Sequence, residues 1–272
     1  MDSASEIIVV KRKTVIRHRL YVRLTHWVSA FCLVASFMTG LQIFNADAAL
    51  SLGKTTDFDA PILSIDASED GSRGVTKLFG RSFDTTGVLG VSTGPNGPEQ
   101  RAFPRWITVP ADQDLATSRR YHFLFAWVLV LNGLVYWAFG WASGHFGRDM
   151  WPRLRDFAAL PRSILDHIRL KFEPSTQKYN VLQKLTYAGV IFGAVPVMIL
   201  AGITMSPGIT SAFPFLLDAF GGRQTARTVH FAIAWALALF FFVHVGLVLV
   251  TGLGRHMRAM TTGRATETER MP

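Results

Sequence analysis

Residues 225–253, TARTVHFAIAWALALFFFVHVGLVLVTGL, form an apolar stretch long enough to cross a membrane and contain His230 and His244. On an α-helix, their 14-residue spacing separates them by about 21 Å and returns them to within roughly 40° of the same face. Ionisable residues are rare in spanning helices and usually face the interior of a bundle. Either histidine alone could be a structural residue. The pair predicts a helix that presents two imidazoles inward, one near each end.

The composition is typical of a membrane protein, because 49% of the 272 residues are hydrophobic and only 17% are charged. A spanning helix needs about 20 predominantly apolar residues. We therefore predict an all-α membrane protein, a bundle of four transmembrane helices occupying 24–253. The four stretches that qualify are roughly 24–44, 121–143, 185–206 and 228–253.

Basic residues cluster beside the predicted helix ends, so the net charge of +9 is interpreted as a topology signal and not as a nucleic-acid surface. The segment 1–23 has six Lys/Arg against two acids, and 144–184 has eight against four. Four further arginines lie in the tail 254–272. The positive-inside rule therefore places both termini and 144–184 in the cytoplasm. The apolar and basic residues of 149–172 alternate, which predicts a segment lying on the cytoplasmic membrane interface.

The segment 45–118 is a long insertion on the outer side, with eight glycines, five prolines and a net charge of about −4. Short strands are suggested at 88–92 and 106–109, but the sequence predicts no fold for the whole segment. Loops of this length are usually either functional or disordered. A docking surface for an outer partner and a flexible insertion both remain open.

The histidines of the predicted helices sort into two pairs by depth. His26 opens the first helix on the cytoplasmic side, level with His244, and His122 opens the second on the outer side, level with His230. An iron porphyrin with two axial imidazoles needs one ligand on each ring face, and helix bundles hold cofactors between facing helices. We therefore predict two bound hemes. Gly40 and Gly133 are expected to leave room for a flat group, and the propionates of heme are expected to find partners among Arg23, Arg119, Arg120 and Arg227. Cys32 is expected to be a packed thiol, and Met38, Met198 and Met205 are expected to be core residues. We assign no ligand role to His18, His145, His167 and His256.

The motifs RLTHW at 23–27, Tyr121-His122, YNVLQK at 179–184, and His230 with His244 resemble those of bacterial di-heme b-type cytochromes. These are the cytochrome b561-like membrane subunits of nickel–iron hydrogenases, formate dehydrogenases and, most closely, thiosulfate-reductase-type enzymes. The resemblance covers all four helices. It implies two heme b groups, a quinone pocket near Asn180 on the cytoplasmic side, and a location in the bacterial inner membrane. We include Gln183, which belongs to the same motif, as a second candidate quinone-binding residue. It also implies a periplasmic catalytic partner, for which molybdenum is favoured over nickel–iron.

The resulting hypothesis is an electron-transfer subunit, not itself the catalytic subunit, that carries electrons in either direction between the quinone pool and a periplasmic oxidoreductase. One alternative is a stand-alone quinone-linked oxidase of superoxide, which needs no partner. Another, from a different class, is a proton-coupled transporter that uses the histidines as a relay. A reduced-minus-oxidised spectrum separates the transporter from the other two, since it predicts no visible absorbance.

Overall fold

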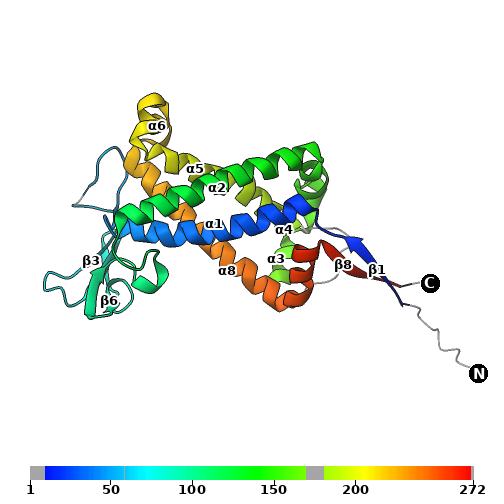
Figure 1. Cartoon of the computed structure of the whole chain (residues 1–272), viewed down its shortest axis with the longest axis horizontal. Coiled ribbons are helices and arrows are strands. Elements are labelled where there is room, and N and C mark those ends of the chain that lie inside the picture. The colour runs from blue at the N-terminus through cyan, green and yellow to red at the C-terminus, as the bar shows by residue number, and fades with distance from the viewer. Residues whose placement is uncertain (1–9, 58, 170–180, 271–272) are drawn as a thin grey trace, which may run out of the picture.

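The computed structural model describes residues 10–57, 59–169 and 181–270. Four helical spans are long and apolar enough to cross a membrane, which confirms the predicted fold class. Along the bundle, α1 packs on α2 and α5 packs on α8 (Figure 1). The spans are α1 Leu20–Phe44, α2 Leu115–Ala142, the third span of α4 Val181–Ala188, η4 Gly189–Ala194 and α5 Val195–Thr204, and α8 Arg223–Thr262.

One side chain from each span meets at the centre of the bundle. Cys32 of α1, Leu129 of α2, Met198 of α5 and Leu237 of α8 form one buried cluster. The expected packed thiol at Cys32 is therefore present, with the residue 1% exposed. Many large apolar side chains elsewhere on α1, α2 and α8 are exposed, as expected of surfaces that face lipid instead of water.

The third span is interrupted by a π-helical segment, η4, directly before Pro196. Proline lacks the N–H that an α-helix uses and crowds the preceding turn, and π turns are one way in which a helix accommodates such a break. The distortion expected at Pro196 thus falls on the residues before it. After the third span, Pro207 begins a short helix, α6 Pro207–Ala212, which is followed by α7 Phe215–Phe220.

Helix α8 is kinked at Gly252, whose φ of 112° and ψ of 86° are not helical. Glycine takes positive φ readily because it has no Cβ. The predicted end of the span at Leu253 coincides with this kink. Within 254–272, the segment predicted as a cytoplasmic tail, helix continues to Thr262 and strand β8 Arg264–Arg270 follows.

The two termini pair with each other. Strand β1 Val10–Ile16 runs antiparallel to β8, with Ile16 opposite Arg264. Figure 1 shows β1 and β8 at one end of the bundle, which we call the terminal end. Four spans bring the chain back to the side of the membrane on which it started, which agrees with the pairing of these two strands.

The insertion between α1 and α2 is folded, and we call residues 49–107 the β-cap. Its core joins Leu50, Ile65 and Phe103 to Leu41 and Phe44 at the end of α1. A four-stranded antiparallel sheet has the order β2-β3-β4-β5, beside the hairpin β6-β7. Its elements are β2 Ala49–Leu50, β3 Leu63–Ala67, β4 Gly74–Leu78, β5 Arg81–Asp84, β6 Gly90–Gly94, β7 Gly97–Arg101 and η1 Arg105–Ile107.

The strand suggested at 106–109 is wrong, because the structure has a 3-10 turn at η1. Pro104 and Pro110 flank it, and proline cannot donate to a sheet ladder. The strand suggested at 88–92 overlaps β6, which starts two residues later.

The segment after α2 lies at the terminal end and carries η2 Phe146–Met150, η3 Leu154–Ala159 and α3 Leu160–Ile168. Asp156 accepts a hydrogen bond of 2.8 Å from Lys184 of α4, and both side chains are nearly buried. This ion pair attaches the interfacial segment to the third span.

Candidate functional site

The structure brings the four predicted histidines together in two pairs. The imidazole rings of His26 and His244 have centroids 6.3 Å apart and planes inclined at 57°. Those of His122 and His230 have centroids 6.1 Å apart and planes inclined at 65°. Because α1 starts at the terminal end and α2 starts beside the β-cap (Figure 1), the two pairs lie at opposite ends of the bundle, and α8 contributes to both.

The ring separations suit one metal between each pair. Two metal–imidazole bonds of about 2.0 Å, arranged in line, place the ring centroids roughly 6 Å apart. Among the described residues, no three His, Cys, Asp or Glu side chains converge on a common point. A bare zinc site needs three or four protein ligands, whereas a porphyrin supplies its own equatorial nitrogens and needs only axial ones. The residues present therefore fit heme.

The pair near the β-cap is oriented by backbone carbonyl groups. Nδ1 of His122 lies 3.0 Å from the carbonyl oxygen of Ser36, and Nδ1 of His230 lies 2.8 Å from that of Met198. A carbonyl oxygen only accepts, so both Nδ1 atoms carry hydrogen. Each Nε2 then keeps its lone pair, the arrangement that second-shell partners impose on metal-binding histidines.

Two glycines border this same pair. A Cβ placed on Gly40 of α1 would lie 3.4 Å from Cε1 of His122, and one on Gly202 of α5 would lie 3.2 Å from Cε1 of His230. At Gly202 a Cβ would require the ring of His230 to shift by a few tenths of an ångström, whereas at Gly40 it would make ordinary van der Waals contact with His122. Gly40 was expected to leave room for a flat group, and the structure places it directly against a histidine. Gly133 has no such neighbour within 4 Å.

The sequence analysis assigned no role to Gly202 of the third span. The carbonyl of Met198 and the glycine one helical turn later together fix the ring of His230. A glycine four residues after a buried methionine is too common in membrane helices to indicate this role. Only the contact with α8 reveals it.

The pair near the terminal end is held differently. The ring of His26 meets Trp27 edge to face at 5.2 Å, and His244 stacks on Phe240 at 5.8 Å. Nδ1 of His26 is buried and has no hydrogen-bond partner within the described chain. A buried polar atom without a partner costs free energy, so this ring is suited to a bound group.

A polar residue in α2 also supports this pair. The side-chain amide of Asn132 donates 2.9 Å to the carbonyl of Thr25 and 2.8 Å to Oγ of Ser29. These bonds attach α2 to α1 on either side of His26. An asparagine within the apolar stretch 121–143 was a signal that sequence reasoning could have used.

Of the two predicted quinone residues, Asn180 lies outside the described residues, and Gln183 is partly buried in α4. Gln183 is one residue from Lys184, whose ion pair with Asp156 reaches the interfacial segment.

Several expected propionate partners are engaged elsewhere. Arg227 forms an ion pair with Asp47, and Arg23 donates to the carbonyl of Thr261 at 2.6 Å. Arg119 lies over the ring of Phe123. Of the other histidines, His256 contacts Thr251 at 2.9 Å and His145 is buried beside Phe146.

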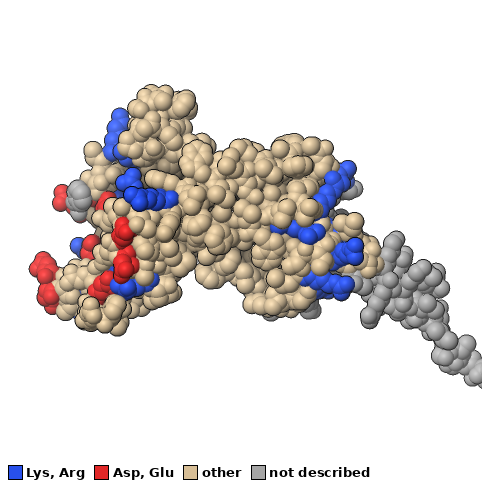
Figure 2. Space-filling view, in the orientation of Figure 1, with Lys and Arg blue, Asp and Glu red and all other residues tan. Residues whose placement is uncertain are grey.

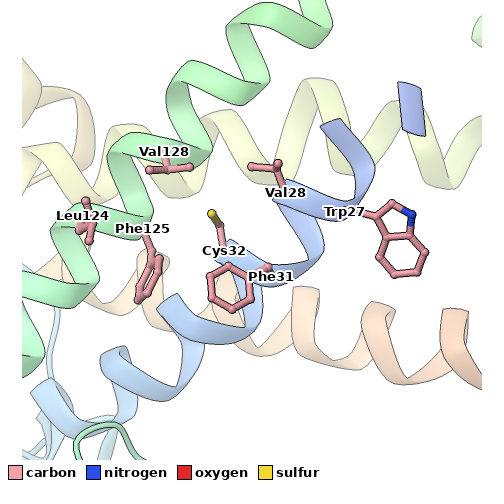
Figure 3. Close-up of a pocket in the computed structure, with 7 residues that line it drawn as sticks. All are labelled: Trp27, Val28, Phe31, Cys32, Leu124, Phe125 and Val128. Atoms are coloured by element: carbon pink, nitrogen blue, oxygen red, sulfur yellow. The ribbon is translucent and has the colours of Figure 1, made fainter. Parts of the chain in front are cut away.

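A groove of about 490 Å³ opens on the lipid-facing side between α1 and α2. Figure 3 shows Cys32 at its base with Phe31 and Phe125 beside it. The lining contains aromatic and aliphatic side chains and the Cys32 thiol, without a charged group. This lining suits hydrocarbon chains.

Comparison with known proteins gave two findings. A family model described as prokaryotic cytochrome b561 matches residues 17–263. A protein from Azospira oryzae, provisionally described as protein-methionine-sulfoxide reductase subunit YedZ1, is 31% identical over 150 residues, which cover 55% of this chain and 72% of that protein. No solved structure matches.

Proposed function

Because this chain belongs to the prokaryotic cytochrome b561 family, we propose that it carries electrons through two heme b groups between the quinone pool and a periplasmic oxidoreductase. His26 with His244 holds one heme and His122 with His230 the other. The observation that carries the proposal is the two facing imidazole pairs, with centroid distances of 6.3 and 6.1 Å, joined by one helix.

The residues of the chain bind and orient these groups. Heme b supplies reversible one-electron oxidation and reduction. The Ser36 and Met198 carbonyls keep Nε2 of His122 and His230 available for binding. Asn132 fixes the part of α1 that carries His26. The bundle core, formed by Cys32, Leu129, Met198 and Leu237, excludes water between the two pairs.

The quinone site belongs near the start of the third span, by Gln183 and Asn180. Its support is the resemblance of 179–184 to the family motif. The His26–His244 pair at the terminal end would exchange electrons with it. The positive-inside distribution supports a cytoplasmic location for this end of the bundle, and the resemblance supports a bacterial inner membrane. Electron transfer is permitted in both directions.

The β-cap and residues 207–225 form the surface that a periplasmic catalytic subunit would use. The relative from Azospira oryzae is described as a reductase subunit, which supports a catalytic oxidoreductase partner. That this partner is of the molybdenum type rests only on the resemblance of the sequence motifs. The β-cap is folded, and it exposes Phe79 and Trp106, each at 76%. Exposed aromatic side chains are enriched in protein interfaces.

The testing experiment is a heme count on the purified full-length protein and three variants. We expect two heme b per wild-type chain in a pyridine hemochrome assay. His244→Ala should lose the heme of the terminal end together with quinol-dependent reduction, and His122→Ala should lose the other. Each of these two variants should therefore retain one heme.

His256→Ala is the matched control and should keep both hemes, because His256 lies on the same helix with its Nε2 in contact with Thr251 and not with a second imidazole of the described chain. A wild-type protein with one heme, or His244→Ala protein that retains two, would show that the pairing is wrong. Loss of absorbance in none of the variants would exclude heme at these residues.

A further inference from the structure

A hollow of about 310 Å³ at the terminal end is lined by three arginines. It lies where the last turns of α8 meet β8, between Arg255 and Arg258 on the helix and Arg264 on the strand. We call it the arginine hollow. Neither Arg258 nor Arg264 uses its guanidinium in a hydrogen bond or an ion pair with any residue of the described chain. Arg255 donates only to the carbonyl oxygen of Thr251.

Two glycines with positive φ, Gly252 and Gly263, shape the hollow. The kink at Gly252 turns the helix after the end of the apolar span, and Gly263, at φ 78°, ends it. The chain then returns as β8 beside β1. Both turns need positive φ, which favours glycine. The kink at Gly252 and the helix end at Gly263 therefore bring the three arginines to one place within the 13 residues 252–264.

Further basic residues lie beside the hollow. The backbone N–H of Arg17 donates to the carbonyl of Gly263, and the side chain of Arg23 lies against the same glycine. The nearly buried acid of this end, Asp156, is paired with Lys184. On the face in Figure 2, acidic side chains gather over the β-cap, and the terminal end shows basic ones. Three arginines without a described counter-ion therefore face one space.

Apolar side chains alternate with these arginines. Leu253 and Met257 are exposed on the same short helical segment. They are four residues apart and so lie on one face. A segment with exposed apolar and cationic residues at the end of a span lies at the headgroup level of a membrane.

We propose that the arginine hollow binds the phosphate of an anionic phospholipid. Guanidinium groups match phosphate oxygens with paired hydrogen bonds, and basic pockets at the ends of spanning helices bind anionic headgroups. Leu253 and Met257 contact the acyl chains. The same chemistry would also take a free phosphate group, so the experiment separates the two sources.

The test uses full-length protein in neutral detergent and native mass spectrometry with equimolar phosphatidylglycerol and phosphatidylcholine. Wild-type protein should retain phosphatidylglycerol in preference. The double variant Arg258→Gln/Arg264→Gln should bind it roughly 30-fold more weakly, taking the usual contribution of one basic residue near an anionic surface for each arginine. The matched control is Arg162→Gln/Arg169→Gln, which removes two exposed arginines of the interfacial segment and should bind like wild type.

Each outcome decides the proposal. If millimolar inorganic phosphate does not displace the bound phosphatidylglycerol, the hollow binds a phospholipid. If inorganic phosphate displaces it, the hollow binds phosphate, and the natural ligand is a soluble phosphate. Equal retention of both lipids by wild-type protein, or equal loss in both double variants, overturns it. Loss of heme or a changed heme spectrum in Arg258→Gln/Arg264→Gln also overturns it, because the hollow would then serve heme carboxylates. These readouts are independent of electron transfer activity.

Discussion

Gly40 and Gly202 border the two rings near the β-cap, and at Gly202 even an added Cβ would be in tight contact with the ring. His122 and His230 are then fixed at Nδ1 by carbonyl oxygens of Ser36 and Met198. At this scale the site depends on what surrounds each histidine as much as on the histidine itself.

We predict that Gly202→Val displaces the ring of His230 and lowers occupancy of the heme near the β-cap severalfold. The reason is that even the first added carbon would lie 3.2 Å from that ring. The heme count and the reduced spectrum measure the effect, and the heme of the terminal end should persist. Gly208→Val is the control, because a Cβ at Gly208 would meet nothing within 4 Å. Equal heme loss in both variants would contradict the prediction.

The Asp114 carboxylate at the start of α2 supplies a prediction on pH. It accepts from the Thr117 N–H at 2.9 Å as the N-cap, and its hydrogen bonds to Thr117 lower the pKa of the carboxyl group. Since the pKa of Asp114 is lower in the folded protein than in the unfolded chain, the ionised cap stabilises α2 at pH values above the ordinary pKa of a carboxyl group. That stability is lost as pH falls through the lowered pKa.

Asp114→Ala should therefore lower the thermal midpoint at pH 7 and leave it nearly unchanged at pH 2. Thermal unfolding followed by tryptophan fluorescence at both pH values measures this. Asp112→Ala is the control, because Asp112 is not the cap, although it pairs with Arg105. A midpoint difference that is equal at both pH values would show that the charge of Asp114 is not responsible.

At the scale of elements, α8 is the helix on which the rest depends. It contributes a ring to both pairs, a residue to the bundle core and the wall of the arginine hollow. Its kink at Gly252 separates the spanning part from the interfacial part.

Gly252→Ala should be destabilising, because φ of 112° brings a Cβ into steric conflict with the backbone. We expect a loss of about 1–2 kcal/mol, which is the usual cost per residue of a left-handed backbone. Gly254→Ala is the matched control two residues away, where a Cβ meets nothing within 4 Å. It should be neutral or stabilising by about 0.5–1 kcal/mol. Thermal unfolding of both variants measures the difference, and a Gly252→Ala protein as stable as Gly254→Ala would show that the kink is not required.

At the scale of the whole molecule, a folded β-cap covers one end of the bundle and paired termini with the interfacial segment close the other (Figure 1). One link between the interfacial segment and the spans is the ion pair of Asp156 and Lys184, with side chains 8% and 11% exposed. Removing one partner of a buried pair leaves an uncompensated charge.

Lys184→Met should therefore destabilise the protein by about 3–5 kcal/mol, whereas Lys184→Met/Asp156→Leu should recover most of that loss. Thermal unfolding monitored by tryptophan fluorescence and by heme absorbance gives the double-mutant cycle. Additive losses in the double variant would mean that the two side chains do not act as a pair.

The sequence by itself determined the four spans, the shared location of both termini, the two candidate histidine pairs and the family. Apolar length, charge at helix ends and a 14-residue spacing are properties of neighbouring residues, so they can be counted along the chain. These properties can therefore be predicted without knowing how the helices pack.

Only the tertiary structure decided which atoms orient each ring, that Gly202 borders His230, how the β-cap folds, and that Arg255, Arg258 and Arg264 share one hollow. These features join residues from different elements. Their positions depend on helix rotation, strand register and backbone reversals at glycine, and the local sequence pattern leaves those undetermined.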